Sequence, residues 1–331
     1  MNGRERVRRA VTFQRPDRIP TDLWTLPGTW TRHGNELRAL LKRYPVDFGS
    51  TNYHDPFNSP RLYEPGDYVD PWGVGWRNVM PGILGMPVEH PLEDYANLNS
   101  YESPYHLLDY GFEDVEVSIV ASRDRFIVGG FTRLFEQMQW LRGTANLFID
   151  LAENRPELYQ LRDMVHEFNL RYVDRWLRYD VDAIGFSDDW GGQNQLLIRP
   201  EIWRKVFAPC YEEIFARVKA AGKFVFFHSD GYILEIIEDL IALGVDALNS
   251  QVWCMGVEAL GQRFAGRICF WGEVDRQQLL PHGTPDEVHA AIRKMVKLLA
   301  TPEGGLIGQG EVGPDVPIVN AEVLLSAWND S

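Results

Sequence analysis

Short apolar runs alternate with amphipathic segments from about residue 120 onward. Each run is apolar at most of its positions, which is typical of a strand buried on both faces of a sheet. The runs cover 125–130, 183–187, 223–228, 245–250, 267–272 and 305–309. We therefore predict six buried strands in this part of the chain.

The segments between these runs have apolar residues at helical spacing, and their ends carry helix-capping residues. Pro200 begins one such segment, and Gly222 ends it. The sequence Thr-Pro-Asp-Glu at 284–287 is a capping box with proline at the first helical position. A stripe of isoleucine and leucine over 233–241 ends at Gly244. This pattern predicts helices between the strands.

Repeated strand-then-helix order implies parallel strands joined by right-handed crossovers. We predict an α/β protein with a single (β/α)8 TIM-barrel domain over residues 1–331; an open, doubly wound sheet is the alternative. No glycine-rich dinucleotide fingerprint or P-loop follows a strand, which favours the barrel. Residues 1–120 are less regular, and we expect a helix around 4–11 followed by excursions that cap one mouth of the barrel. Residues 121–331 would form the regular units.

Composition limits the classes of function. With 331 residues, 45% of them hydrophobic, the chain can form one large core. The net charge of −14 and the lack of a basic stripe exclude a nucleic-acid binder. The 3 cysteines lack C-x-x-C spacing, which fits a reducing compartment. Because we find no signal peptide and no apolar stretch near the ~20 residues of a membrane span, we expect a cytoplasmic protein that does not contact the membrane.

Polar residues follow the predicted strands. His228 and Asp230 end one run, and residues two apart in extended backbone point to the same side, so the two can converge. Four further strands end in polar stretches, which are Ser187 to Gln193, Asn249 to Gln251, Gly272 to Asp275 and Gln309 to Glu311. Because the sites of α/β barrels lie at the carboxyl ends of the strands, we predict a functional cavity there.

The predicted cavity is rich in carboxylates, contains one imidazole, and has hardly any arginine or lysine. Such charges must be offset by a cation, by protonation or by a cationic substrate. We predict a divalent metal, zinc first with manganese or iron as alternatives, on His228, Asp230 and one of two glutamates, Glu273 or Glu311. An acid–base pair or a structural pair of His228 and Asp230 is the other interpretation.

Asp188 and Asp189 are the further catalytic candidates beside His228 and Asp230, either to position the substrate or to move a proton. The alternative for Asp188, Asp189 and Asp275 is that they cap helix N-termini. The predicted substrate-binding residues are Trp190, Gln193, Asn249, Gln251, Trp271, Asp275 and, from the N-terminal region, His54. Tryptophans could wall a pocket for an apolar or methylated substrate or serve only in packing; the set is Trp72, Trp76, Trp190, Trp253 and Trp271.

As a set, several motifs spread over essentially the whole chain resemble the uroporphyrinogen decarboxylase superfamily. They are Arg4-Glu5-Arg6-Val7, the stretch from Arg15 to Pro20, Asp70-Pro71-Trp72-Gly73, Asp188 to Gly191 with Gln193, His228 to Gly231, Gly272 to Asp275, and Pro314 to Pro317 before Asn320. This resemblance implies a distorted (β/α)8 barrel. It also implies one of two activities, which are decarboxylation in the heme pathway and metal-dependent methyl transfer with corrinoid proteins.

The two branches of that superfamily differ in motifs. The decarboxylase branch carries Arg-Gln-Ala-Gly-Arg, which holds a polycarboxylate porphyrinogen, where this chain has Pro20-Thr21-Asp22-Leu23-Trp24. An acidic cavity poor in arginine would repel that substrate. The methyltransferase branch holds zinc with His-x-Cys-Gly and a later cysteine, where this chain has His228-Ser229-Asp230-Gly231 and Gly310. Oxygen in place of sulfur makes the site harder and less electron-rich, which disfavours the usual thiol acceptor.

Three hypotheses follow. The first is a corrinoid-linked methyltransferase or demethylase that acts on a small molecule with a Lewis-acid metal, with a corrinoid carrier protein docked over the barrel mouth. The second is a carboxy-lyase acting on a tetrapyrrole or another small acid, in which Asp189 would stabilise a cationic intermediate. The third is a non-catalytic binding protein on the same fold. A homodimer is compatible with all three.

Overall fold

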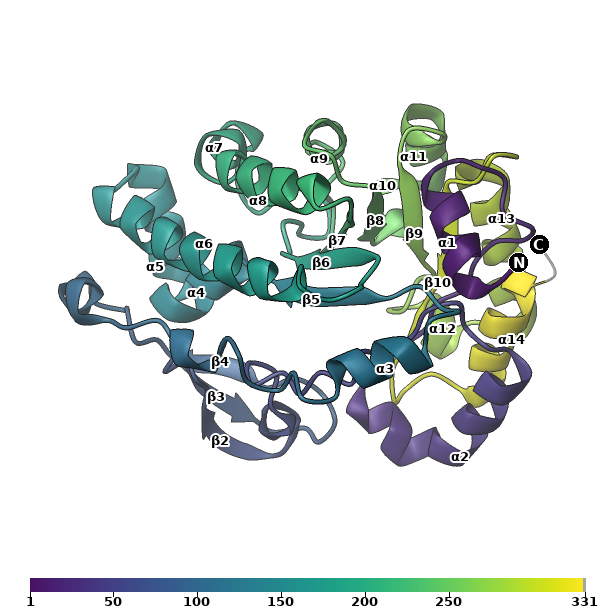
Figure 1. The fold of residues 1–331 in the computed structure, drawn as a ribbon, viewed down its shortest axis with the longest axis horizontal. Helices are drawn as coiled ribbons and strands as arrows, with labels where there is room; N and C mark the ends of the chain where they lie inside the picture. Colours follow the sequence, from purple (N-terminus) through teal and green to yellow (C-terminus); the bar gives the residue numbers. More distant parts are fainter. Residues whose placement is uncertain (330–331) are drawn as a thin grey trace.

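The computed structural model describes residues 1–329, and its centre is a parallel sheet of six strands in the spatial order β10-β9-β8-β7-β6-β5 (Figure 1). Each strand pairs in parallel with its neighbour along the chain, as the repeated order predicts. The strands are β5 (Val128–Thr132), β6 (Ala183–Ser187), β7 (Phe224–Ser229), β8 (Ala247–Ser250), β9 (Cys269–Glu273) and β10 (Leu306–Gln309). The six predicted strands are thus confirmed.

Backbone hydrogen bonds continue this sheet into a closed ring through two segments of the N-terminal region. Segment 20–25 pairs with β10 at Gly308, and its last two residues form β1 (Trp24–Thr25), which pairs with β11 (Glu311–Val312). The amide of Asp47 donates to the carbonyl of Thr21 (2.8 Å), and the carbonyl of Asp47 accepts from the amide of Phe126 (2.9 Å), next to β5. With these segments the ring has eight members, so the predicted (β/α)8 barrel is confirmed.

This ring corrects one expectation, because the N-terminal region does more than cap the barrel. Segments 20–25 and 47–49 are barrel strands, and neither carries the apolar run that reveals the other six. The predicted first helix is present as α1 (Gly3–Val11), where Val7 and Val11 pack with Phe126 and Phe226 of the barrel interior. Because Arg4 and Arg8 of α1 both bond Asp182, just before β6, this helix lies at the amino-terminal end of the strands.

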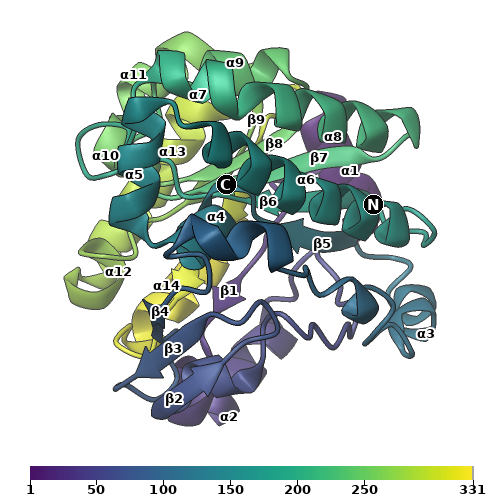
Figure 2. The same ribbon diagram turned by 90° about the vertical axis from the view of Figure 1, so that its left-hand side faces the viewer.

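Helices cover the outside of the sheet (Figures 1 and 2). They are α4 (Phe135–Arg142), α5 (Thr144–Glu153), α6 (Pro156–Trp176), α7 (Pro200–Val206), α8 (Ala208–Ala220), α9 (Ile237–Ala242), α10 (Val252–Met255), α11 (Val257–Phe264), α12 (Leu279–His282), α13 (Pro285–Leu299) and α14 (Ile318–Asn329). The capping box of α13 is confirmed by the bond from the Glu287 amide to the Thr284 hydroxyl (3.3 Å). The single helix predicted from Pro200 to Gly222 is two helices, because Pro209 cannot continue the hydrogen-bond ladder of α7.

The rest of the N-terminal region lies on the side of the six-stranded sheet opposite α6 to α9 (Figures 1 and 2). It contains α2 (Pro27–Arg43), α3 (Val115–Ala121), the antiparallel strands β2 (Gly66–Val69), β3 (Gly75–Asn78) and β4 (Met86–Glu89), and the 3-10 helices η1 (Pro60–Tyr63), η2 (Tyr95–Ser100) and η3 (Tyr105–Leu107). None of the helices within residues 1–329 combines the length and hydrophobicity that a membrane span requires. The single-domain organisation stays a prediction.

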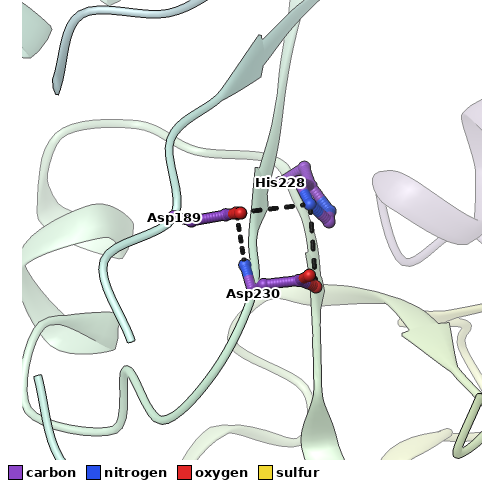
Figure 3. A group of neighbouring side chains, drawn as sticks. All are labelled: Asp189, His228 and Asp230. Atoms are coloured by element: carbon purple, nitrogen blue, oxygen red, sulfur yellow. Dashed lines mark hydrogen bonds and ion pairs between the residues drawn. The ribbon is translucent and has the colours of Figure 1, made fainter. Parts of the chain in front are cut away.

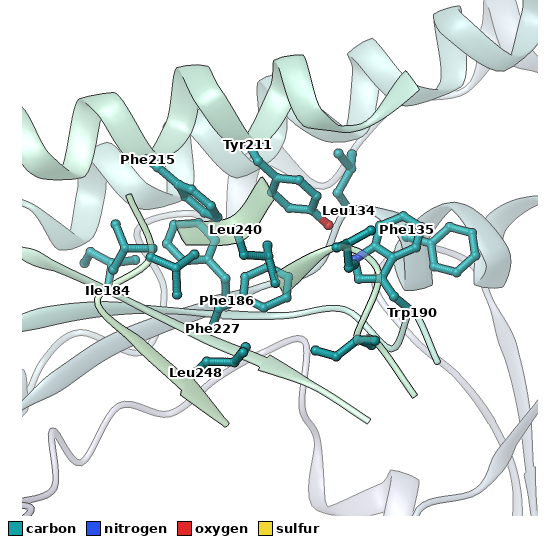
Figure 4. Close-up of a cluster of buried hydrophobic side chains, with 14 of the residues drawn as sticks. Leu134, Phe135, Ile184, Phe186, Trp190, Tyr211, Phe215, Phe227, Leu240 and Leu248 are labelled. Atoms are coloured by element: carbon teal, nitrogen blue, oxygen red, sulfur yellow. The ribbon is translucent and has the colours of Figure 1, made fainter. Parts of the chain in front are cut away.

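An aromatic core between the sheet and the helices holds the strands in place (Figure 4). Phe186 of β6 packs edge-on against Phe215 of α8 (ring centroids 4.8 Å apart), and Trp190 stacks on Phe135 of α4 (4.1 Å). Both tryptophan and phenylalanine bury large areas, so these contacts anchor the loop that follows β6. The carboxyl ends of β6 and β7 therefore form a rigid base for the polar residues beyond them.

Candidate functional site

The end of β7 carries His228, and the loops after β6 and β7 bring Asp189 and Asp230 beside it (Figure 3). Nε2 of His228 lies 3.5 Å from Oδ1 of Asp189 and 3.8 Å from Oδ1 of Asp230. The backbone amide of Asp230 donates to Oδ1 of Asp189 (2.8 Å), which fixes that carboxylate beside the imidazole. One ligand atom from each residue lies within 4.8 Å of the other two, so the three could surround a single metal ion. We call these three residues the open cluster.

Asn249 of β8 fixes the orientation of the imidazole. Its Oδ1 lies 2.6 Å from Nδ1 of His228, while its Nδ2 donates to the carbonyl of Trp271 (2.7 Å) and to Oε1 of Gln309 (3.2 Å). Because the amide nitrogen already has two acceptors, the amide oxygen faces the ring, and Nδ1 carries the proton. In the neutral ring, the lone pair of Nε2 therefore points toward the two carboxylates, as in metal-binding histidines.

The charges around His228 favour a cation. Burial lowers the pKa of the imidazole, but the carboxylates of Asp230 and Asp189 outweigh it and hold that pKa above its usual value. Oδ1 of Asp230 is buried and has no hydrogen-bond partner among the described residues, which is rare for a carboxylate oxygen. One nitrogen and two carboxylate oxygens suit zinc, manganese or iron. The residues present therefore fit a divalent metal.

Arg276 lies at the same rim and was not predicted. Its guanidinium donates to Glu273 (2.7 Å), to Glu311 (3.3 Å) and to Oδ2 of Asp230. The expectation of a cavity with hardly any arginine is wrong at this point. Arg276 follows Glu273 by three residues, just past the strand-end stretch, and that spacing was the available signal.

Arg276 separates the four predicted metal ligands into two groups. His228 and Asp230 belong to the open cluster, where Asp189 is the third member, whereas Glu273 and Glu311 are bound to Arg276. Burial raises the pKa of Glu273 to about 7 and also raises that of Glu311, and the charge of Arg276 opposes both shifts. We call Arg276 with Asp230, Glu273 and Glu311 the closed cluster.

Two predicted acidic residues accept from backbone amides, Asp188 at the N-terminus of α4 and Asp275 in a turn. The buried carboxylate of Asp188 accepts from the amides of Leu134 (2.8 Å) and Glu136 (2.9 Å) at the start of α4, and from the hydroxyl of Tyr211 (2.6 Å). Burial raises the pKa of Asp188 to about 6, although these hydrogen bonds oppose the shift. Asp275 accepts from the amides of Gln277 and Gln278 (2.9 Å each), in the turn before α12. Asp188 thus points toward α4 rather than toward His228.

The predicted substrate-binding residues occupy several different environments. Trp190 is fully buried against α4, and Trp271 lies in the barrel interior. Asn249 lies behind His228, while Gln193 and Gln251, together with Trp253 and Asp275, line a second cavity of about 250 Å³ beside Arg276.

Three predicted residues of the N-terminal region lie away from the open cluster. Trp72 and Trp76 are buried around Asp70, which accepts from the indole of Trp76 (2.9 Å) and the amide of Trp72 (2.9 Å). The side chain of His54 is 70% exposed and lies 3.9 Å from Asp114. Packing around Asp70 therefore accounts for the burial of Trp76. Trp72 packs there too, but it also lines a small pocket beside the main cavity.

The main cavity has a volume of about 530 Å³ and contains His228 and Glu311 at its strand-end side. Its other lining includes aromatic residues and two opposite charges, which are Trp24, Tyr53, Phe131, Tyr172, Trp176, Asp55 and Arg133. These lining residues were not predicted from the sequence. The signal was present at 53–55, because side chains two apart in extended backbone share a side, so that Tyr53 and Asp55 line the cavity while His54 points out.

A buried aspartate below the cavity was also missed. Asp22 accepts from the indole nitrogens of Trp24 and Trp271 (3.0 Å each) and from the amide of Leu23 (2.9 Å). Burial raises the pKa of Asp22 to about 6, and these hydrogen bonds oppose the shift. Asp22 therefore fixes Trp24, whose ring centroid lies 5.3 Å from that of His228.

Comparisons with known proteins give a family and a fold. A family model described as Uroporphyrinogen decarboxylase (URO-D) matches residues 83–330. A solved methyltransferase from Methanosarcina mazei aligns with a TM-score of 0.74 and 15% identity, over 100% of this chain and 99% of that chain. A glycosylated endo-β-1,4-xylanase from Gloeophyllum trabeum reaches a TM-score of only 0.39 at 12% identity, over 61% of this chain and 67% of that chain. No curated protein matches this sequence. At such low identity the methyltransferase shows a shared fold.

Proposed function

This chain belongs to the uroporphyrinogen decarboxylase family, and from that premise we propose that it is a corrinoid-linked methyltransferase or demethylase whose divalent metal is held by Asp189, His228 and Asp230. The observation that supports this proposal most strongly is the orientation of His228. Its Nδ1 contacts Asn249, and its Nε2 faces two carboxylates, one of which has a buried oxygen that accepts no hydrogen bond from the described residues. The fold shared with a methyltransferase supports the choice of reaction class.

The bound metal would supply Lewis-acid activation of the methyl donor or acceptor. The residues around it have separate tasks. Asn249 keeps Nε2 of His228 directed at the open cluster, and Arg276 holds Oδ2 of Asp230 so that Oδ1 stays available. The aromatic residues of the main cavity would form its apolar wall beside the reacting groups. A corrinoid carrier protein would approach from the cavity opening.

A carboxy-lyase acting on a small acid is the second candidate, and Arg133 is the observation in its favour. This arginine lines the main cavity and could bind one substrate carboxylate. One cavity arginine cannot balance the many carboxylates of a porphyrinogen, and Arg276 is already bound to three acidic side chains. The lyase would therefore act on a small acid and would not need a metal.

Methyl transfer to free cob(I)alamin tests the proposal. The zinc-loaded protein is incubated with methylated amines, methoxyaromatics or methyl thioethers, and methylcobalamin formation is followed by its absorbance. We expect at least one donor class to react, with loss of turnover in His228→Ala and normal turnover in His289→Ala, a histidine of α13 far from the cavity. Metal-free protein that releases CO₂ from a small acid, and never methylates cobalamin, would contradict the proposal in favour of the lyase.

A further inference from the structure

Two opposite charges face the main cavity without pairing with each other. Asp55 and Arg133 both line this cavity and the small pocket beside it, yet they form no ion pair together within residues 1–329. Oδ1 of Asp55 accepts from the amide of Phe57 (2.9 Å), and its other oxygen has no partner in the described chain. The guanidinium of Arg133 has one acidic neighbour, Glu136 at 3.5 Å, and donates no hydrogen bond to any described residue. Both groups thus have free hydrogen-bonding capacity.

The burial of Asp55 makes its lack of a cation costly. Burial raises the pKa of this carboxyl, and the amide of Phe57 and the charge of Arg133 lower it only in part. The half-buried carboxylate of Asp55 and the guanidinium of Arg133, whose side chain is 34% exposed, each lose part of their hydration, and a ligand without charges would offer neither a charged partner. A ligand that carries both charges would satisfy both residues.

The wall between these charges and His228 is aromatic. Tyr53 and Trp176 meet edge-on with their ring centroids 5.0 Å apart, and Tyr172 lies 6.4 Å from Trp176. On the other side, the ring of Trp24 lies 5.3 Å from that of His228, so the aromatic wall reaches the open cluster. Aromatic faces attract methylated ammonium groups, which bind by cation–π contact and need no hydrogen-bond acceptor.

We propose that the main cavity binds a small zwitterion of the N-methylated amino acid class, with its carboxylate on Arg133 and its methylated ammonium group against Asp55 and the aromatic wall. The volume of about 530 Å³ lies within the range of small-molecule sites and is ample for such a ligand. A role for this ligand as the methyl donor rests on the proposed function, whereas its binding does not.

Isothermal titration of the full-length protein with three probes of matched shape tests the binding. Trimethylglycine carries both charges, choline carries only the ammonium group, and 3,3-dimethylbutanoate carries only the carboxylate beside a tert-butyl group. We expect trimethylglycine to bind at least about tenfold more tightly than either single-charge probe, because each charge-assisted contact is worth about 1.5 kcal/mol or more. Equal affinity for all three probes, or no binding of trimethylglycine, would overturn the proposal.

Two variants assign the contacts. We expect Arg133→Met to weaken trimethylglycine by about 10- to 100-fold while leaving choline unchanged, and Asp55→Asn to weaken both ammonium probes but not 3,3-dimethylbutanoate. Arg204→Met removes an arginine that binds Asp239 on the outer surface and is the matched control. Circular dichroism would confirm that each variant is folded. If both cavity variants bind trimethylglycine as tightly as the wild type does, the assigned contacts are wrong.

Metal content measured on the same preparations separates this inference from the proposed function. Protein that holds a metal on the open cluster but binds no zwitterion overturns this inference alone. Protein that binds trimethylglycine through Arg133 and Asp55 but holds no metal overturns the metal-dependent function alone.

Discussion

The open and closed clusters lie at one barrel rim, share Asp230 and use similar side chains, yet they differ in how their charges are balanced. In the closed cluster, Arg276 binds Asp230, Glu273 and Glu311, so the protein supplies its own cation. In the open cluster, Oδ1 of Asp189 and Oδ1 of Asp230 have His228 as their only basic side-chain neighbour among the described residues, and Oδ1 of Asp230 accepts no hydrogen bond from any of them. From this difference we infer that atoms left unpaired, rather than the number of acidic residues, distinguish a candidate metal site from an ion-pair network.

Replacement of the imidazole of the open cluster should have the largest effect on this difference. His228→Ala removes the only nitrogen ligand of the open cluster, and we expect zinc affinity to fall by more than the ~10- to 100-fold typical of an outer-shell change. Competition with a chromogenic chelator measures the affinity, and His289→Ala is the control. Unchanged affinity in His228→Ala would place the metal elsewhere.

Removal of the internal cation should convert the closed cluster into an open one. Arg276→Met leaves three acidic side chains without their partner, and we expect the free energy of unfolding to fall by about 3–5 kcal/mol at pH 8. We also expect zinc binding to increase, because Glu273 and Glu311 become available as ligands. Arg276→Lys should restore part of the stability.

The stability loss in Arg276→Met should depend on pH. The folded-state pKa of Glu273 is raised from 4.5 to about 7, so the folded state holds its proton more tightly than the unfolded state does. The contribution of Glu273 to the free energy of unfolding is therefore fully present below pH 4.5 and is lost as the pH rises through about 7, and without Arg276 this loss should be larger. Urea titrations at pH 5 and pH 8 measure both values; equal losses at the two pH values would contradict this explanation.

Loss of the residue that orients His228 should have a moderate effect. Asn249→Ala removes the acceptor of Nδ1 but leaves all three ligands, so we expect zinc affinity to fall by about 10- to 100-fold with stoichiometry unchanged. The same chelator competition measures it. Wild-type zinc affinity in this variant would show that the orientation of the His228 ring does not depend on Asn249.

Substitution of Asp188, the residue before Asp189, should have the smallest effect on metal binding. Asp188→Asn weakens the cap of α4 and the bond to Tyr211, so we expect a stability loss of about 1–3 kcal/mol and wild-type zinc affinity. Loss of zinc binding in the folded variant would show that Asp188 contributes to the metal site.

Six barrel strands could be predicted because both of their faces are buried, which leaves a continuous apolar run. The other two members of the ring could not, because they are short and partly polar. Asp47, for example, is buried in its strand segment only because Arg6 and Arg18 bind it and the amide of Thr21 donates to it. Such partners come from distant parts of the chain and leave no local pattern.

The candidate site shows the same limit. The two-residue period of a strand places His228 and Asp230 on one side, and Asp189 follows the neighbouring strand, so the open cluster is within reach of sequence reasoning. Arg276 and Asp55 are positioned by loops, whose paths depend on tertiary contacts. Without Arg276, the two glutamates look as suitable for a metal as Asp189 does.

Metal stoichiometry in two charge-matched variants tests the central claim most directly. Asp189→Asn and Glu273→Gln each remove one negative charge from a different cluster, and plasma mass spectrometry after equilibration with zinc gives the metal per chain. We predict one zinc per chain in the wild type and in Glu273→Gln, and loss of zinc in Asp189→Asn. Retention in Asp189→Asn with loss in Glu273→Gln would contradict the assignment and place the metal on the cluster that Arg276 now occupies.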